Sequence, residues 1–235
     1  MLIDLYTNIL YSDPFSLVLV KLILAFSLLY LSMASSFYFF GKLGHQKGWT
    51  KPVSTLPLFK HQIRTEITYS FVSIVIFACY GVLTIWLYRQ NLLEISFDNN
   101  WLILVDLFIF AIWNEVHFFA VHRLMHTKLL LPFHRIHHKS VVVTPFSTFS
   151  FHPVESFLMG SVMIIPMLFF PFEIYALILL PIYSLFFNTL GHSNIAFINQ
   201  KNLISTQHNT HHTKFNFNFG FISHQLEKIF KRNPK

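Results

Sequence analysis

The sequence predicts an all-α integral membrane protein: a bundle of about four to five membrane helices with a histidine-rich helical cap on its cytoplasmic side. Of its 235 residues, 54% are hydrophobic and only 11% are charged, whereas soluble domains carry about 25% charged residues. Several apolar runs approach the length of about 20 residues that a membrane helix needs. The 14 histidines are clustered rather than scattered.

Five apolar runs are candidates for the membrane helices. Residues 17–40, 68–88 and 101–121 are each long enough to cross a bilayer. Residues 156–170 and 174–188 are shorter and flank a Pro-Phe-Glu turn, so we expect a tight helical hairpin there. No basic region precedes the first run, and we therefore expect no cleavable signal peptide.

The charges predict the orientation of this bundle. If the chain alternates through five helices, residues 41–67, 122–155 and 189–235 lie on one side. That side holds all of the 17 basic residues except Lys21 and Arg89. Because cytoplasmic loops are enriched in Lys and Arg, we expect this side to face the cytoplasm. The basic balance fits a membrane protein, and nothing in it suggests nucleic acid.

Nine histidines fall on this same side with the spacing of metal ligands. His122 and His126 form H-x-x-x-H, and two later segments repeat H-x-x-H-H. On a helix, residues three or four apart lie on one face, so we expect their imidazoles to converge. The candidate metal ligands are His122, His126, His134, His137, His138, His192, His208, His211 and His212. One metal takes about six ligands, and nine histidines therefore imply two metals.

Residue identities exclude two classes of metal site. A zincin protease needs H-E-x-x-H, but Arg123 follows His122 and Asn209 follows His208. A carboxylate di-iron bundle needs several Glu ligands, which the membrane runs lack. Cys79 is the single cysteine. Imidazole by itself suits iron, zinc, copper or nickel, so ligand type leaves the metal open.

The motifs from about residue 101 to 220 resemble the fatty acid hydroxylase/sterol desaturase superfamily of membrane histidine-box enzymes. They are E-V-H-F-F-A-V-H-R-L-M-H at 115–126, H-R-I-H-H-K-S at 134–140, T-P-F-S-T-F-S-F-H-P at 144–153, N-T-L-G-H-S-N at 188–194 and H-N-T-H-H-T-K-F-N-F-N-F-G at 208–220. We divide the chain into N-terminal membrane helices with a basic loop, 1–100, and a hydroxylase/desaturase-like catalytic domain, 101–235.

The resemblance implies an oxidoreductase that hydroxylates or desaturates a lipid, either fatty acyl, sterol or sphingolipid-like. It implies two ferrous ions, dioxygen and electrons from an external cytochrome b5-, ferredoxin- or reductase-like protein. The expected location is a bacterial inner membrane or the endoplasmic reticulum. Asn188 stands where the family often has another histidine, so it is a candidate ligand, directly or through water.

Further polar residues are expected to support the metal ligands. Glu115 lies two helical turns before His122, so we expect it to hydrogen-bond a ligand imidazole. His152 belongs to an H-P motif and could be a metal ligand, a supporting group or a loop brace; of these we expect the supporting role. Asn216, Asn218 and Gly220 alternate with phenylalanines and look like anchors of a cap over the site.

The other histidines and two rival functions complete the expectations. His117 is rotated away from His122 on the helix, and His45, His61 and His224 stand alone in polar loops, so we expect none of them to bind metal.

The first rival function is that of a histidine-rich membrane metal transporter, but the ligands of a transporter should line a path near the membrane centre. The second is an inactive member of the superfamily.

Overall fold

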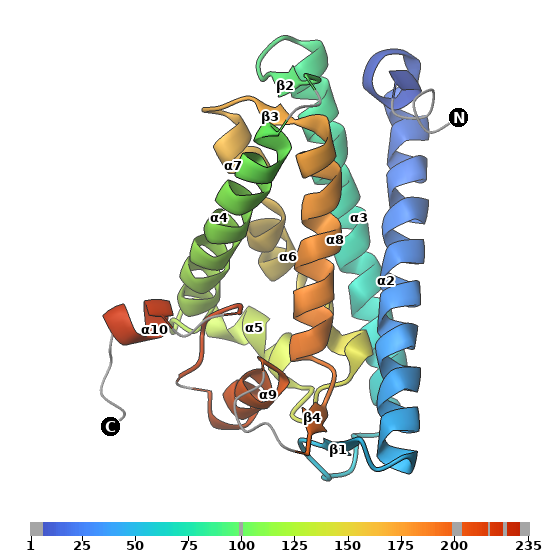
Figure 1. Cartoon of the computed structure of the whole chain (residues 1–235), viewed down its shortest axis with the longest axis vertical. Coiled ribbons are helices and arrows are strands. Elements are labelled where there is room, and N and C mark those ends of the chain that lie inside the picture. The colour runs from blue at the N-terminus through green and yellow to red at the C-terminus, as the bar shows by residue number, and fades with distance from the viewer. Residues whose placement is uncertain (1–6, 99–100, 199–203, 216, 223–224, 231–235) are drawn as a thin grey trace.

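Four long helices run side by side along the longest axis of the molecule (Figure 1). The computed structural model describes residues 7–98, 101–198, 204–215, 217–222 and 225–230. The long helices are α2 (Phe15–Gln46), α3 (Gln62–Arg89), α4 (Leu102–Met125) and α8 (Ile174–Gly191). A short π-helix, Asn8–Ser12, precedes α2 at the end of the bundle where the N-terminus lies.

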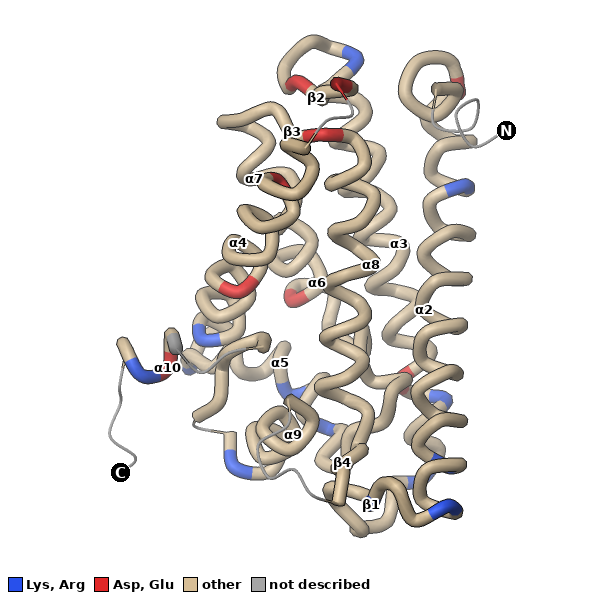
Figure 2. Tube along the Cα trace, viewed as in Figure 1, with Lys and Arg blue, Asp and Glu red and all other residues tan. Residues whose placement is uncertain are grey.

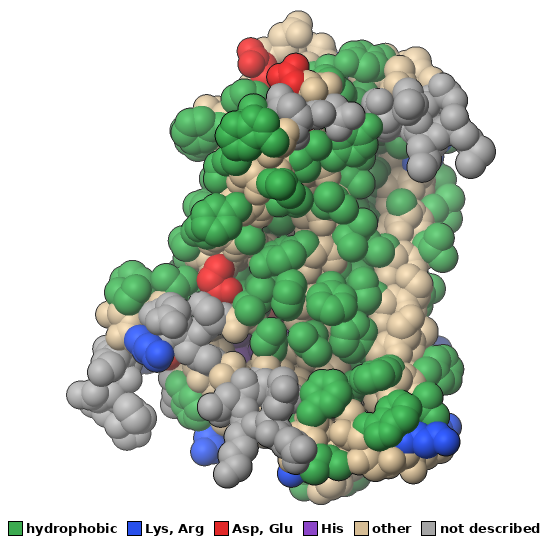
Figure 3. Space-filling view, viewed as in Figure 1, with side chains coloured by type: hydrophobic (Ala, Val, Ile, Leu, Met, Phe, Trp, Pro, Cys, Tyr) green, Lys and Arg blue, Asp and Glu red, His purple; other side chains and the backbone are tan. Residues whose placement is uncertain are grey.

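The predicted fold class is confirmed. Among the described residues, these four helices are long and apolar enough to cross a membrane. Hydrophobic side chains cover the middle of the visible face (Figure 3), as expected where lipid replaces water as the solvent. Backbone groups in lipid must be satisfied internally, which long helices achieve by themselves.

The helix expected over residues 156–170 is wrong as a single element. The segment forms α6 (Pro153–Gly160) and α7 (Ile164–Met167), separated by a turn. Side chains satisfy the unwound backbone: Trp113 Nε1 of α4 donates to the Val162 carbonyl at 2.7 Å, and Ser161 Oγ donates to the Leu158 carbonyl at 2.8 Å. Such breaks are tolerated at membrane depth where protein supplies the missing partners.

The two ends of the bundle differ in structure and in charge. At the end near the N-terminus, β2 (Ile95–Ser96) pairs in parallel with β3 (Phe172–Glu173). The opposite end carries α5 (Leu131–His138), α9 (Ile204–Lys214), α10 (Gln225–Ile229) and an antiparallel pair, β1 (Thr50–Pro52) with β4 (Ile195–Phe197). Figure 2 shows Lys and Arg concentrated at this second end.

Buried polar contacts hold α3 against the loop after α5. Glu66 of α3 is 1% exposed, and its carboxylate accepts hydrogen bonds from Gln62 (2.7 Å), Ser140 (2.7 Å) and Thr144 (2.5 Å). Thr144 also caps the short 3-10 helix Pro145–Ser147. This loop begins directly after His138, so the contacts position one end of the histidine-bearing helix α5.

Candidate metal centre

The structure gathers all nine candidate histidines into two neighbouring groups. Within each group, one nitrogen from every imidazole lies within 4.8 Å of all the others. The first group is His122, His126, His134, His138 and His211; the second is His137, His192, His208 and His212. All of them are buried except His126, which is half-buried.

Helices α5 and α9 each contribute histidines to both groups. In α5, His134 and His138 belong to the first group and His137 to the second; in α9, His208 and His212 belong to the second group and His211 to the first. The expectation that i, i+3 pairs converge is therefore wrong, whereas the i, i+4 pairs do converge. The reason is helical geometry: from residue i, positions i+3 and i+4 are rotated in opposite directions and lie about 100° apart.

Three imidazoles of the first group meet in a triangle. The Nε2 atoms of His126, His138 and His211 lie 3.1 Å (126–211), 3.2 Å (126–138) and 3.1 Å (138–211) apart. His211 Nδ1 donates to the Phe217 carbonyl at 2.8 Å, so its Nε2 presents a lone pair. A nitrogen of a neutral imidazole either donates or accepts a hydrogen bond, so hydrogen bonds cannot satisfy all three contacts of the triangle. One cation can bind all three nitrogens.

The second group shows the same convergence. His208 Nε2 lies 2.8 Å from His192 Nε2 and 3.1 Å from His212 Nε2. His192 Nδ1 donates to Ser147 Oγ at 2.7 Å, while that hydroxyl donates onward to the Thr144 carbonyl. The Ser147 contact thus leaves the His192 Nε2 lone pair directed at the other imidazoles.

Hydrogen bonds on the outer nitrogens orient further imidazoles of the first group. His134 Nδ1 lies 2.9 Å from a Glu155 carboxylate oxygen, and both side chains are 1% exposed. His122 Nδ1 donates to the Phe219 carbonyl at 3.1 Å. In each imidazole the inner Nε2 is buried without a hydrogen-bond partner. Metal-binding histidines commonly hold their outer N–H on a carboxylate or carbonyl in this way.

These nitrogens fit a pair of first-row metal ions. Imidazole nitrogens bind such metals at about 2.0–2.1 Å, so two ligands at right angles lie about 3.0 Å apart. The close nitrogen pairs measure 2.8–3.2 Å. Buried polar atoms normally have partners, and the inner nitrogens of His122 and His134 lack them. A metal ion would supply the missing partner.

Burial also keeps the imidazoles neutral, which is the form that binds metals. Removal from water, together with the nearby His211, lowers the pKa of His126 and of His137 to about 3. Burial lowers the pKa of His211 to about 4. For His192 and His212 burial places the pKa well below its ordinary value.

Glu155 is a supporting residue that sequence reasoning missed. It lies in the first turn of α6, three residues after His152, and its carboxylate meets His134. The sequence does contain a signal, because an acidic residue stands at the start of an apolar run. Burying its charge is costly unless the carboxylate has a buried partner. Its partner is far away in the sequence, and spacing alone could not identify it.

Glu115 holds the chain segment that follows Phe219. Its two carboxylate oxygens accept hydrogen bonds from the backbone amides of Phe221 (3.1 Å) and Ile222 (2.8 Å). These residues follow Phe219, whose carbonyl accepts from His122. Glu115 therefore acts on the ligand through the chain segment that it anchors.

His152 does not reach the histidine groups. Its Nδ1 accepts from the Val154 amide at 3.1 Å and so caps the start of α6. Its ring packs on Phe133 at 4.8 Å. The expected ligand-supporting role is replaced by a structural one that places Glu155 one turn later. His117 contacts Ser161 Oγ at 2.9 Å instead of joining either group.

Asn188, Asn218 and Gly220 lie at the rim of the centre. Asn188 is one helical turn before His192 in α8, and its amide donates to the Thr148 carbonyl at 3.1 Å. Asn218 adopts a left-handed backbone, with φ of 63°, and donates to the Gln207 carbonyl. Gly220 lies between the segment's contacts with His122 and Glu115. Asn216 and His224 lie outside the described residues, and His45 and His61 are exposed.

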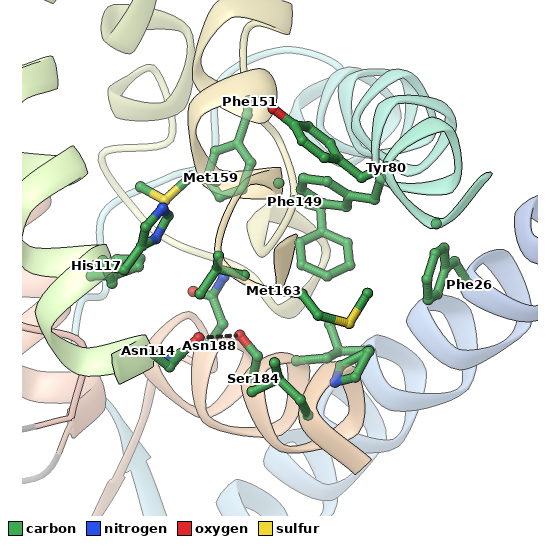
Figure 4. Close-up of a pocket in the computed structure, with 18 of the residues that line it drawn as sticks. Phe26, Tyr80, Asn114, His117, Phe149, Phe151, Met159, Met163, Ser184 and Asn188 are labelled. Carbon is green, nitrogen blue, oxygen red and sulfur yellow. Dashed lines mark hydrogen bonds between the residues drawn. The ribbon is translucent and has the colours of Figure 1, made fainter. Parts of the chain in front are cut away.

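A cavity of ≈ 140 Å³ adjoins the histidine groups inside the bundle. Its lining comes mainly from aromatic and aliphatic side chains of α2, α3, α4, α6 and α8 (Figure 4). Phe118 and Phe151 line it and also contact the metal centre: the Phe118 ring lies 5.1 Å from His122, and the Phe151 ring lies 5.0 Å from His137. The cavity thus ends against both groups.

Comparison with known proteins identifies relatives over the part of the chain that carries the histidines. A 132-residue stretch, 54% of this chain, is 28% identical to the Delta(7)-sterol 5(6)-desaturase ERG3 of Saccharomyces cerevisiae and covers 36% of that protein. The probable Delta(7)-sterol 5(6)-desaturase of Neurospora crassa is 24% identical over 83% of this chain and 59% of its own length. The chain therefore spans only part of these relatives. No solved structure matches it.

The sequence profile of the fatty acid hydroxylase family matches residues 107–232. This range includes all nine histidines: seven lie in α4, α5 and α9, and His126 and His192 directly follow α4 and α8. On this match, which covers more than half of the chain, the chain belongs to the fatty acid hydroxylase family.

Proposed function

We propose that this chain is a membrane-bound oxidoreductase that uses two iron ions and dioxygen to hydroxylate or desaturate a lipid. The observation that carries the proposal is the sorting of nine buried imidazoles into two adjacent groups beside an apolar cavity. Family membership favours iron over the other metals that imidazole accepts.

The bound irons would supply the oxidising power to break an unactivated C–H bond, which no side chain can do. The protein's residues supply the rest. Burial keeps the ligand nitrogens unprotonated, while Glu155, Ser147 and the Phe217 carbonyl hold the outer nitrogens and thereby orient the rings. Asn188 is a tenth candidate ligand at the edge of the second group.

The cavity is the proposed binding site for the lipid. Its walls are largely apolar, and Phe118 and Phe151 separate it from the histidines by a single layer of rings. The relatives named as sterol desaturases favour testing sterols first, beside fatty acyl and sphingolipid-like lipids.

We further propose that the histidine end faces the cytoplasm, in a bacterial inner membrane or the endoplasmic reticulum. Its concentration of Lys and Arg supports this orientation (Figure 2). A cytochrome b5-, ferredoxin- or reductase-like protein would deliver electrons there. Residues 101–235 would form the catalytic domain, while the helices of 1–100 brace it through contacts such as that of Tyr30 Oη with the Phe146 carbonyl at 2.7 Å.

The test is expression in a host of defined lipid composition, followed by lipid mass spectrometry. The wild type should produce lipids that have gained one oxygen or lost two hydrogens, and the His137→Ala variant should not. His45→Ala is the matched control, because His45 is exposed and outside both groups. It should behave as the wild type does.

Two other outcomes would favour the rival functions. Metal uptake into sealed vesicles without any lipid product would indicate a transporter. Bound iron that consumes no oxygen with any reductant or candidate lipid would indicate an inactive family member. The burial of both groups at one end of the bundle, rather than along a path through it, favours the enzyme.

A further inference from the structure

The cavity beside the metal centre is apolar except for five side chains. They are Tyr80, Asn114, His117, Ser184 and Asn188. A cavity meant for plain hydrocarbon gains nothing from polar walls, because each polar group loses hydration when it is buried. Each of the five therefore needs a hydrogen-bond partner.

Four of the five have their hydrogen-bond donor occupied by protein. Tyr80 Oη donates to the Phe157 carbonyl at 2.7 Å, and Asn188 Nδ2 donates to the Thr148 carbonyl at 3.1 Å. His117 Nε2 meets Ser161 Oγ at 2.9 Å. Ser184 Oγ donates to Asn114 Oδ1 at 3.2 Å. These groups are satisfied without a ligand.

Asn114 is the exception. Its side chain is 3% exposed, and its amide nitrogen has no hydrogen-bond partner. The Ser184 contact holds the carbonyl end of the amide, as Figure 4 shows, so the orientation of the side chain is already set. An unpaired buried donor costs about 1–3 kcal/mol. A bound molecule that brings an acceptor oxygen would recover this cost.

We propose that Asn114 is the specificity residue of the cavity and binds a hydroxyl or carbonyl oxygen of the lipid. The inference rests on the proposed lipid-oxidising function and names its substrate class. Asn114 and His122 are eight residues apart on α4, which corresponds to about 12 Å along the helix axis. The substrate is thus an already oxygenated lipid whose oxygen binds about two helical turns from the level of His122.

The oxygen also has a defined depth. His122 lies near the histidine end of α4, whereas Asn114 lies in its middle. The lipid therefore places its oxygen deeper in the bundle than the carbon that reacts. Part of an unmodified hydrocarbon chain could enter the same cavity but would leave the Asn114 amide nitrogen unpaired, so such chains would bind more weakly.

Binding to the metal-free protein tests this inference separately from turnover. The full chain is purified in detergent with chelator, and affinities are measured for n-heptadecane and for the mid-chain ketone and alcohol of the same skeleton. One recovered hydrogen bond predicts about 3- to 10-fold tighter binding of the oxygenated probes to the wild type. In Asn114→Leu the three probes should bind equally.

Controls separate a lost contact from a lost fold. Asn114→Ala removes the same amide group and introduces a smaller side chain than Asn114→Leu. If Asn114→Leu does not fold, the binding preference is measured in Asn114→Ala. Thermal unfolding shows whether each variant is folded. Ser27→Ala also removes a buried unpaired polar atom, but Ser27 does not line the cavity, so the preference for oxygenated probes should persist. Equal binding of all probes to the wild type, or a preference that survives in both Asn114 variants, would overturn the inference. A preference with no lipid oxidation in cells would overturn the proposed function alone.

Discussion

His137 and His138 are consecutive residues of α5, yet their imidazoles belong to different histidine groups. Successive residues on a helix point about 100° apart, so one short helix can serve two metals only if it lies between them. Helix α9 does the same from the other side with His211 and His212. The two groups are therefore built jointly and not from separate segments.

This arrangement predicts that neighbouring substitutions damage different sites. His137→Ala removes a ligand of the second group, and His138→Ala removes one of the first. Each should weaken metal binding at one site by at least about tenfold and leave the other site occupied at moderate metal concentration. Elemental analysis with Mössbauer spectra of iron-57 protein would reveal which site is lost. Identical spectra for the two variants would contradict the assignment of the groups.

The contact between Glu155 and His134 predicts a supporting effect on metal affinity. Glu155→Ala removes the acceptor for His134 Nδ1, and loss of such a contact typically weakens metal binding about 10- to 100-fold. Glu155→Gln keeps an acceptor oxygen and should lose less. Competition with a chromophoric chelator measures both. Glu173→Gln is the control: Glu173 is equally buried but lies at the opposite end of the bundle, and its change should leave metal affinity intact.

The anchoring of residues 221 and 222 by Glu115 predicts a local effect on backbone dynamics. Hydrogen bonds to a charged group contribute about 1.5–3 kcal/mol, so Glu115→Ala should accelerate amide hydrogen exchange at Phe221 and Ile222 by about 10- to 100-fold. Mass spectrometry of peptic fragments measures this. Asp106→Asn is the control, because the Asp106 carboxylate accepts a hydrogen bond from the Glu173 amide at the opposite end of the bundle. Faster hydrogen exchange at Phe221 and Ile222 in this variant would show that the effect of Glu115→Ala is not local.

The lowered pKa values of the histidines predict sensitivity to acid. In the folded protein His126 and His137 protonate only near a pKa of about 3 and His211 near about 4. The unfolded chain takes up these protons near a pKa of about 6.5. Below that value the unfolded state binds more protons than the folded state, so stability falls as the pH falls.

Thermal unfolding of the metal-free protein at about pH 7 and about pH 5 would measure this effect. The melting temperature should be lower at the acidic pH. Metal release should follow the same direction, because protons compete for the ligand nitrogens. A melting temperature that stays constant over this interval would show that the imidazoles are not held neutral by burial.

Much of the metal centre could be predicted without the structure. H-x-x-x-H and H-x-x-H-H repeats are local patterns, and the helical period places their members on shared faces. The distribution of Lys and Arg is also local information, and it placed the histidines at one end of the bundle. Both predictions depend only on neighbours along the chain.

The supporting contacts could not be predicted in the same way. His134 meets Glu155, and Glu115 meets the amides after Gly220, through packing between helices. The expected hairpin helix is broken where the Trp113 indole, far away in the sequence, satisfies the Val162 carbonyl. A pattern shows that a buried polar group needs a partner, but not which one.

The amino-acid order was thus sufficient for the membrane bundle, the family and the identity of the nine histidines, since composition, helical period and residue type are encoded locally. The tertiary structure decided how these histidines divide between two groups, what orients them, and that Asn114 keeps an unpaired amide in the cavity. Those features depend on the angle at which helices meet, and distant parts of the chain set that angle only when they pack together.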